Sequence, residues 1–284
     1  MFRHGIGSCV WSAVLLLPKF LDNFLLERRL SVEMHRFAAA LKAAILFVVV
    51  LSLAACHSRS LTVEQLIEHN VQAVGGKAAL EALRSIRVDL HIVDPDFEVD
   101  GVYLAARSGS MRIDITAGGR HVYTEALDGA RGWQWKGQGQ PVEESAKATA
   151  ALRHGVELPG HLFGLHELTS RGNRLELAGR EQVEGKNYHR LRLTFADGDS
   201  TMLYLDPDSW LITRRRDVRP LHPDIDATPT TIENKMTHFR RVGDLLFSFA
   251  SIDTDLATGK VLEKTSVRSI TLNPAIESSM FQKL

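Results

Sequence analysis

Cysteine is scarce in this sequence of 284 residues, where it occurs only as Cys9 and Cys56. Cys9 lies in a segment that we expect the mature protein to lack, for the reasons given below. The mature chain would then hold a single thiol, and a single thiol cannot form an internal disulfide. The disulfide framework that stabilises many small exported domains is therefore excluded.

Net charge is also absent, because 34 basic side chains balance 34 acidic ones. Residues 1–55 hold six of the basic and three of the acidic side chains, which leaves 28 against 31 in the rest of the chain. The densest basic run, three arginines at 214–216, would point alternately to the two faces of a strand. Nucleic acids require a concentrated basic face, so we expect no nucleic-acid partner.

The longest apolar run is too short to cross a membrane. Residues 43–55 are apolar except for Ser52, and at ~1.5 Å per residue they span ~20 Å, against a hydrocarbon core of ~30 Å. Positive charges precede this run, and Leu53-Ala54-Ala55-Cys56 closes it. The order resembles a bacterial lipoprotein signal, which is cleaved between Ala55 and Cys56 and leaves lipid on the cysteine. A plain secretory signal or an uncleaved anchor is the alternative.

The position of this signal also suggests where the natural chain begins. A signal peptide usually occupies ~15–30 residues from the initiator, and the apolar run starts too late when it is counted from Met1. Counted from Met34, the signal has an ordinary length. We therefore interpret residues 1–33 as a spurious upstream extension, 34–55 as the signal peptide, 56–61 as a lipidated tether and 62–284 as one folded domain.

Helices are expected at the start of this domain and near its middle. Thr62 and Gln65 form a capping box before a helix that Gly75 and Gly76 end, and a short helix over 77–83 follows. An alanine-rich insert at 141–168 predicts a further helix, with Pro141 in its first turn. This insert either covers one mouth of a curled sheet or packs on the sheet as an ordinary surface helix, and the sequence leaves both open.

Between the helices the apolar period changes to two, which predicts many short strands joined by tight turns. The sheet would be large and antiparallel, with about 11 strands, and curled or closed to limit its edges. The candidate strands are 86–93, 97–106, 111–115, 121–127, 132–136, 174–178, 188–195, 201–205, 211–217, 232–241, 245–253 and 261–270.

No pattern in the sequence indicates catalysis. A nucleophile elbow and a Gly-rich phosphate loop are both missing. His154, His161 and His166 with Glu167 form the cluster most like a metal site, but their spacing fits no zinc signature. A run of acidic residues is read as a charged sheet edge, although a bound cation is conceivable: Asp94, Asp96, Glu98 and Asp100. We expect no enzyme activity, no cofactor and no bound metal.

Three short motifs resemble the LolA/LolB family of lipoprotein carriers and its outer-membrane relatives. They are Val74-Gly75-Gly76 before Ala79-Leu80, Tyr204-Leu205-Asp206-Pro207 before Leu211, and the ending Asn273-Pro274-Ala275-Ile276 with Met280-Phe281. The resemblance covers residues 62–281. It implies an α+β fold, mainly antiparallel β, in which helices cover the concave face of a curled half-barrel that can hold acyl chains. Being lipidated, the chain would be more like the membrane-anchored receptor LolB than like the soluble shuttle.

The resemblance also implies a location and a ligand. The residue after the lipidated Cys56 is His57 rather than an aspartate, so the expected location is the outer membrane, with the domain facing the periplasm. A hydrophobic ligand, acyl chains or a lipoprotein, is the expected partner. The alternative is a lipoprotein that carries nothing and docks another envelope protein. Candidate ligand-cavity residues are the apolar and aromatic side chains Tyr103, Tyr123, Trp133, Trp135, Leu162, Phe163, Tyr204, Phe239 and Phe247.

Overall fold

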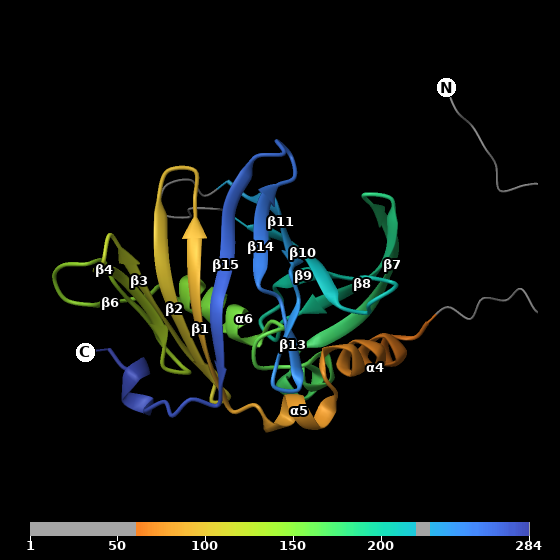
Figure 1. The fold of residues 1–284 in the computed structure, drawn as a ribbon, viewed down its shortest axis with the longest axis horizontal. Coiled ribbons are helices and arrows are strands. Elements are labelled where there is room, and N and C mark those ends of the chain that lie inside the picture. Colours follow the sequence, from red (N-terminus) through yellow and green to blue (C-terminus); the bar gives the residue numbers. More distant parts are fainter. Residues whose placement is uncertain (1–60, 220–227, 284) are drawn as a thin grey trace, which may run out of the picture. The chain divides into compact units, whose positions relative to one another are not determined.

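One antiparallel sheet of 13 strands organises the domain in the computed structural model, which describes residues 61–219 and 228–283 (Figure 1). The signal peptide and Cys56 lie outside the described residues. The strand order is β6-β5-β4-β3-β2-β1-β15-β14-β11-β10-β9-β8-β7. The chain therefore runs outward from β1 at the centre to the edge strand β6, and returns from the opposite edge, β7, until β15 pairs with β1. The sheet is curled and open rather than closed, as predicted.

The strand bounds follow this path. The first half of the sheet holds β1 (Ser85–Val93), β2 (Glu98–Ala106), β3 (Ser110–Ala117), β4 (Arg120–Leu127), β5 (Gly132–Trp135) and β6 (Val142–Glu143). The second half holds β7 (Arg174–Val183), β8 (Lys186–Thr194), β9 (Ser200–Leu205), β10 (Ile212–Arg219), β11 (Thr230–Thr237), β14 (Ala250–Asp255) and β15 (Val261–Leu272). A separate two-stranded hairpin consists of β12 (Arg240–Val242) and β13 (Leu245–Phe247).

Helices lie inside the curl of the sheet and below its lower end in the view of Figure 1. They are α4 (Val63–Val74), α5 (Lys77–Ala82) and α6 (Ala146–Glu157), with the short 3-10 turns η1 (Leu165–Glu167) and η2 (Thr169–Arg171). A third 3-10 turn, η3 (Ser278–Phe281), lies against the outside of the sheet. The predicted capping box at Thr62 and Gln65 is confirmed, and Gly75 ends α4 with a φ of 134°. None of the described helices is long and apolar enough to span a bilayer.

The insert begins differently from the prediction. Val142–Glu143 pairs with β5 as an edge strand, and the Glu144 amide donates to the carbonyl of Gly132. The helix starts only after Ser145, whose Oγ accepts from the amide of Ala148, and it continues past Gly155. The placement of Pro141 in the first helical turn was therefore wrong. A hydroxyl N-cap and the pairing with β5 decide the boundary over the weaker preference of proline.

Two predicted strands, 232–241 and 245–253, are four in the structure. The chain leaves β11 at Thr237, turns at His238 with a φ of 54°, and forms the β12–β13 hairpin before it rejoins the sheet as β14. Thr237 and Ala250 are nevertheless paired, so β11 and β14 are direct neighbours. The other predicted strands occur with shifted ends. Period-two patterning marks residues with extended backbone but does not show which strand they pair with.

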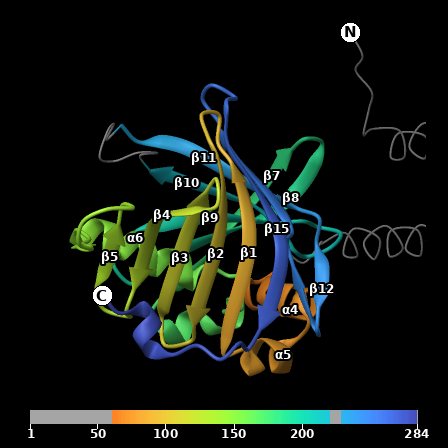
Figure 2. The same cartoon turned by 60° about the vertical axis from the view of Figure 1, so that its left-hand side comes forward.

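The core lies between the sheet and the helices. Ile86 and Val88 of β1 point inward, as do Leu191 of β8 and Leu203 of β9. Leu66, Leu80 and Leu165 meet these side chains from the helical side. Because α6 and the segment after it connect the edge strand β6 to the opposite edge strand β7, the connection has to cross a face of the sheet. It crosses the concave face, which helices α4 and α5 also cover (Figure 2).

Candidate functional site

A cavity of about 440 Å³ lies between the concave face of the sheet and the helices. Strand alternation supplies its sheet wall. Val88 and Tyr103 are cross-strand partners in β1 and β2, and Leu90 follows two residues after Val88 on the same face. Thr265 of β15 and Ser251 of β14 form a further pair that lines the cavity. This wall is therefore built by one face of the centre of the sheet.

The opposite wall is helical. Leu152 and Gly155 of α6 line the cavity, and so do Val74 of α4 and Leu80 of α5. The β12–β13 hairpin closes a further side with apolar side chains that include Leu245 and Phe247. The helical insert thus covers the concave face and lines the cavity, which decides between the two roles that the sequence left open.

Few polar side chains line this cavity, and Tyr103, His161 and Arg215 are among them. The Tyr103 and His161 rings have centroids 5.5 Å apart. Burial among the cavity walls, with Arg215 nearby, lowers the pKa of His161 to about 4, so this ring is neutral at pH 7. His161 is one of the residues that line the cavity, and its side chain remains accessible to solvent. Burial also raises the pKa of the Tyr103 hydroxyl, which stays protonated.

Five of the predicted cavity residues lie at or beneath the cavity, and one lies near it. Tyr103, Phe163, Phe239 and Phe247 line it, and Leu162 is fully buried behind Phe163. Tyr123 of β4 is paired with Ile115, on the concave face but outside the lining. Whether any of these side chains binds a ligand stays a prediction.

Trp133 and Trp135 lie on the convex face instead. They pair with Ala126 and Thr124, whose side chains point away from the helices. The Trp133 indole donates to the carbonyl of Phe281, 2.8 Å away, and thereby holds the C-terminal turn against the outside of the sheet. Trp135 packs on the His121 ring with centroids 4.8 Å apart. These two rings therefore pack on the convex face of the sheet and do not line the cavity.

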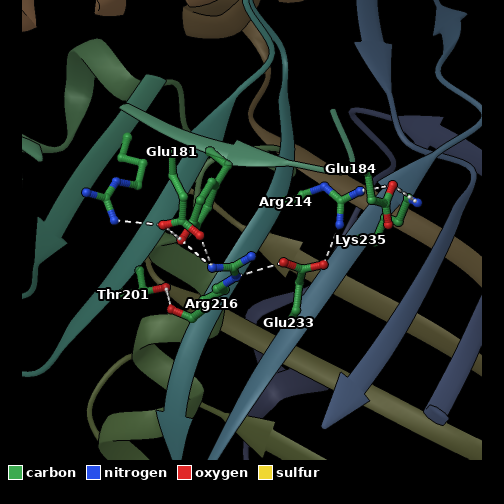
Figure 3. Close-up of polar contacts among 9 residues, drawn as sticks. Glu181, Glu184, Thr201, Arg214, Arg216, Glu233 and Lys235 are labelled. Carbon is green, nitrogen blue, oxygen red and sulfur yellow. Dashed lines mark hydrogen bonds and ion pairs between the residues drawn. The ribbon is translucent and has the colours of Figure 1, made fainter. Parts of the chain in front are cut away.

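Tyr204 also lies on the convex face, where its hydroxyl donates to Glu181 Oε2 at 3.0 Å within a network of charged side chains. Figure 3 shows Glu181, Arg216 and Glu233 of this network. Arg216 donates to Glu181 Oε1 at 2.6 Å, to Glu233 Oε2 at 2.7 Å and to the Tyr204 hydroxyl at 2.8 Å. Arg214, whose side chain is 2% exposed, donates to Glu233 and Glu184. The predicted alternation of the three arginines is confirmed, because Arg215 between them lines the cavity on the other face.

Arg107 ties the helical cover to the sheet. Its guanidinium donates to the carbonyls of Leu80 and Leu83 around α5, and to that of Leu162 at 3.2 Å. It also forms an ion pair with Glu167 at 2.5 Å. Charge-assisted hydrogen bonds of this kind are stronger than neutral ones, and the proximity of Arg107 lowers the pKa of Glu167. One side chain at the end of β2 thus contacts both segments that cover the cavity.

The histidines of the insert are separated in the structure. His161 lies in the cavity, whereas His166 is 3.8 Å from Glu81 and His154 lies against the Phe195 ring. His154 Nε2 is 2.7 Å from Asp197 Oδ2, and Asp199 is beside it, so these three could supply ligand atoms to a metal. Both carboxylates are exposed, and groups of this kind are common without an ion.

The acidic run at 94–100 does not protect a sheet edge, since β2 lies between β1 and β3. Asp94 caps the β1–β2 turn by accepting from the Asp96 amide. Glu98 and Asp100 both contact His91, and Asp100 also contacts Arg268. The two acidic side chains of β2 therefore pair with His91 of β1 and Arg268 of β15.

Most of the polar residues and helix residues that line the cavity were not predicted from the sequence. Arg215 was treated only as one of three consecutive arginines, and no local pattern marks Met236 or Gly155 as lining residues. The aspartate two residues after Arg215 predicts an ion pair on one face of the strand but does not show which face, because Arg112 and Asp114 form the same pair on the convex face. An i, i+2 Arg–Asp pair on a strand places both side chains on one face.

The fold is that of solved LolA superfamily structures. No protein-family model and no curated protein matches the sequence. A LolA superfamily protein from Nitrosomonas europaea is similar in structure, with a TM-score of 0.51 and 13% identity over 79% of this chain and 99% of that chain. A DUF1329 family protein from Desulfovibrio piger has a TM-score of 0.50 and 9% identity over 78% of this chain and 98% of that chain. At these identities the likeness confirms the predicted half-barrel and shows the fold alone.

Proposed function

We propose that this protein is a lipoprotein of the outer membrane, anchored through Cys56 and facing the periplasm, whose cavity holds acyl chains. The chains would belong to a free lipid or to another lipoprotein. The observation that carries the proposal is the apolar cavity between the concave face and the helices. Ligand sites of proteins are concave and mostly apolar, with a few polar groups that orient the ligand.

The size of the cavity fits a single chain. A cavity of about 440 Å³ lies within the range of ~300–1,000 Å³ that is usual for ligand pockets, so a single acyl chain is a ligand of suitable size. Each methylene that leaves water contributes ~0.8 kcal/mol, so a long chain supplies ample driving force against the entropy of binding. The lipoprotein signal at residues 34–55 supports a location where acyl chains are the abundant hydrophobic ligands.

Lipid retained by the purified protein tests the proposal. We expect mass spectrometry after mild detergent extraction to identify non-covalently bound acyl chains. Ser251→Phe would place a benzene-sized ring in the cavity, and a ring of this size fills a cavity of ~150 Å³. We therefore expect the variant to retain shorter chains, or less lipid overall.

Ser266→Phe is the matched control. Ser266 lies on the adjacent strand β15, is exposed and pairs with His91 on the convex face. This variant should retain the same lipid as the unaltered protein. Absence of acyl chains from the unaltered protein, with unchanged stability in both variants, would contradict the carrier proposal and favour the protein-docking alternative.

A further inference from the structure

Arg215 is the one charged residue among those that line the cavity in the described part of the chain. Its side chain comes from the middle of β10, opposite the helical cover, and is 22% exposed. Asp217, two residues along the same strand, is its ion-pair partner. An arginine in an otherwise apolar wall is costly unless its remaining donors find acceptors.

The ion pair with Asp217 uses only part of the hydrogen-bond donors of Arg215. Its Nε donates to Asp217 Oδ2 at 2.8 Å, and within the described residues no acceptor is bonded to its two terminal nitrogens. Arg112 and Asp114 form the same i, i+2 pair on the convex face, but there both Nε and Nη2 donate, at 2.8 and 2.9 Å. The guanidinium of Arg215 therefore keeps the two-pronged edge that binds planar anions.

Neutral hydrogen-bonding groups accompany this charge. The positive charge of Arg215 reaches the His161 ring, whose pKa it helps to lower. His161 and Tyr103 can each donate a hydrogen bond without adding charge. The Ser251 and Thr265 hydroxyls lie on the same wall. Asn70 and Ser248 are the other polar lining residues, and the rest of the lining is mostly apolar and suited to hydrocarbon.

We propose that the ligand is a single-chain amphiphile with an anionic group, a carboxylate or a phosphate, which binds the terminal nitrogens of Arg215. The inference rests on the proposed function, because it assumes that the apolar part holds an acyl chain. It adds that the ligand must carry a negative charge, which burial of an acyl chain alone does not require. Arginine binds carboxylates and phosphates through two parallel hydrogen bonds, which fixes the orientation of the chain as well as its head.

Binding of matched amphiphiles to the delipidated full-length protein tests this inference. Palmitate, hexadecyl phosphate and hexadecanol share a chain length and differ in head group. We expect calorimetry to show that the unaltered protein binds at least one of the two anions about tenfold or more tightly than hexadecanol, since a hydrogen bond between charged groups is stronger than one to a neutral hydroxyl. The comparison of the two anions separates a carboxylate ligand from a phosphate ligand.

Arg215→Gln should lower the affinity for the preferred anion by about tenfold and leave hexadecanol binding unchanged. Arg215→Lys should restore part of the loss. Arg87→Gln is the control, because Arg87 forms the same kind of pair with Asp89 on the convex face. Equal affinity of the unaltered protein for hexadecanol and both anions would overturn the charge requirement while the carrier function stands. Failure to bind any of the three compounds would overturn both.

Discussion

At the scale of single residues, one strand of the sheet places alternate side chains in contrasting environments. Arg214 and Arg216 join a network of glutamates on the convex face, while Arg215 between them faces an apolar cavity. On the convex face Arg214 and Arg216 each bind two glutamates, whereas on the cavity side Arg215 has Asp217 as its ion-pair partner. His161 lies close enough to Arg215 for this charge to reach it.

His161 should titrate far below an ordinary histidine. Its pKa of about 4 in the folded protein compares with 6.5 in the unfolded chain, so the unfolded chain binds more protons between these values. The stability that the neutral ring contributes is complete above pH 6.5 and is lost as the pH falls toward 4. NMR titration of the ring should show this pKa, and Arg215→Gln should raise it. A midpoint near 6.5 would mean that the ring is hydrated and outside the cavity wall.

At the scale of secondary-structure elements, the turn after α4 fixes the helical cover against the β12–β13 hairpin. Gly75 has a φ of 134°, and a Cβ at this position would collide with the carbonyl oxygen of Asp244. The residue is therefore required both by its backbone conformation and by the close approach of the hairpin. Val74 and Leu245, on either side of this contact, both line the cavity.

Gly75→Ala should lower the free energy of unfolding by about 3 kcal/mol, because it combines backbone strain with a steric collision. Gly109→Ala is the control. Gly109 has a φ of 88° but open space around the added methyl, so only strain of about 1 kcal/mol is expected. Urea unfolding of both variants measures the difference, and equal losses would show that the hairpin moves aside at no cost.

The elements also show what the sequence could predict. Local signals sufficed for α4, where the capping box and the glycines fixed both ends, and for most strands, where alternation was clear. They failed for the insert, because no local pattern shows that Val142–Glu143 pairs with β5, although β5 itself was predicted. They also failed for Trp133 and Trp135, since alternation defines two faces of a strand without showing which one the helices cover. Which face the helices cover depends on the path of the connection between the two edge strands, β6 and β7.

At the scale of the whole molecule, the proposed function depends on two parts of the chain that act separately. The described domain, a single compact unit from Leu61 onward, would hold the ligand. The residues before it would supply the anchor. Two or three acyl chains on one cysteine make membrane attachment effectively permanent, because a single chain binds only marginally.

Cys56→Ser should abolish lipid attachment. Cells supplied with radiolabelled palmitate should label the unaltered protein and the Cys9→Ser variant equally, because Cys9 lies in the segment that we expect to be missing. The Cys56→Ser variant should carry no label and should no longer fractionate with the outer membrane. Label on this variant would show that the lipid is attached elsewhere, and label lost from Cys9→Ser would contradict the proposed start at Met34.

The β12–β13 hairpin is an insertion between β11 and β14 that does not pair with the main sheet. Because Thr237 and Ala250 pair directly, the twelve residues between them can change in length or composition without altering the register of β11 on β14. Those residues supply Phe239, Leu245 and Phe247 to the cavity. Substitutions in the hairpin would thus change the shape of the cavity while the pairing of β11 with β14 stays the same.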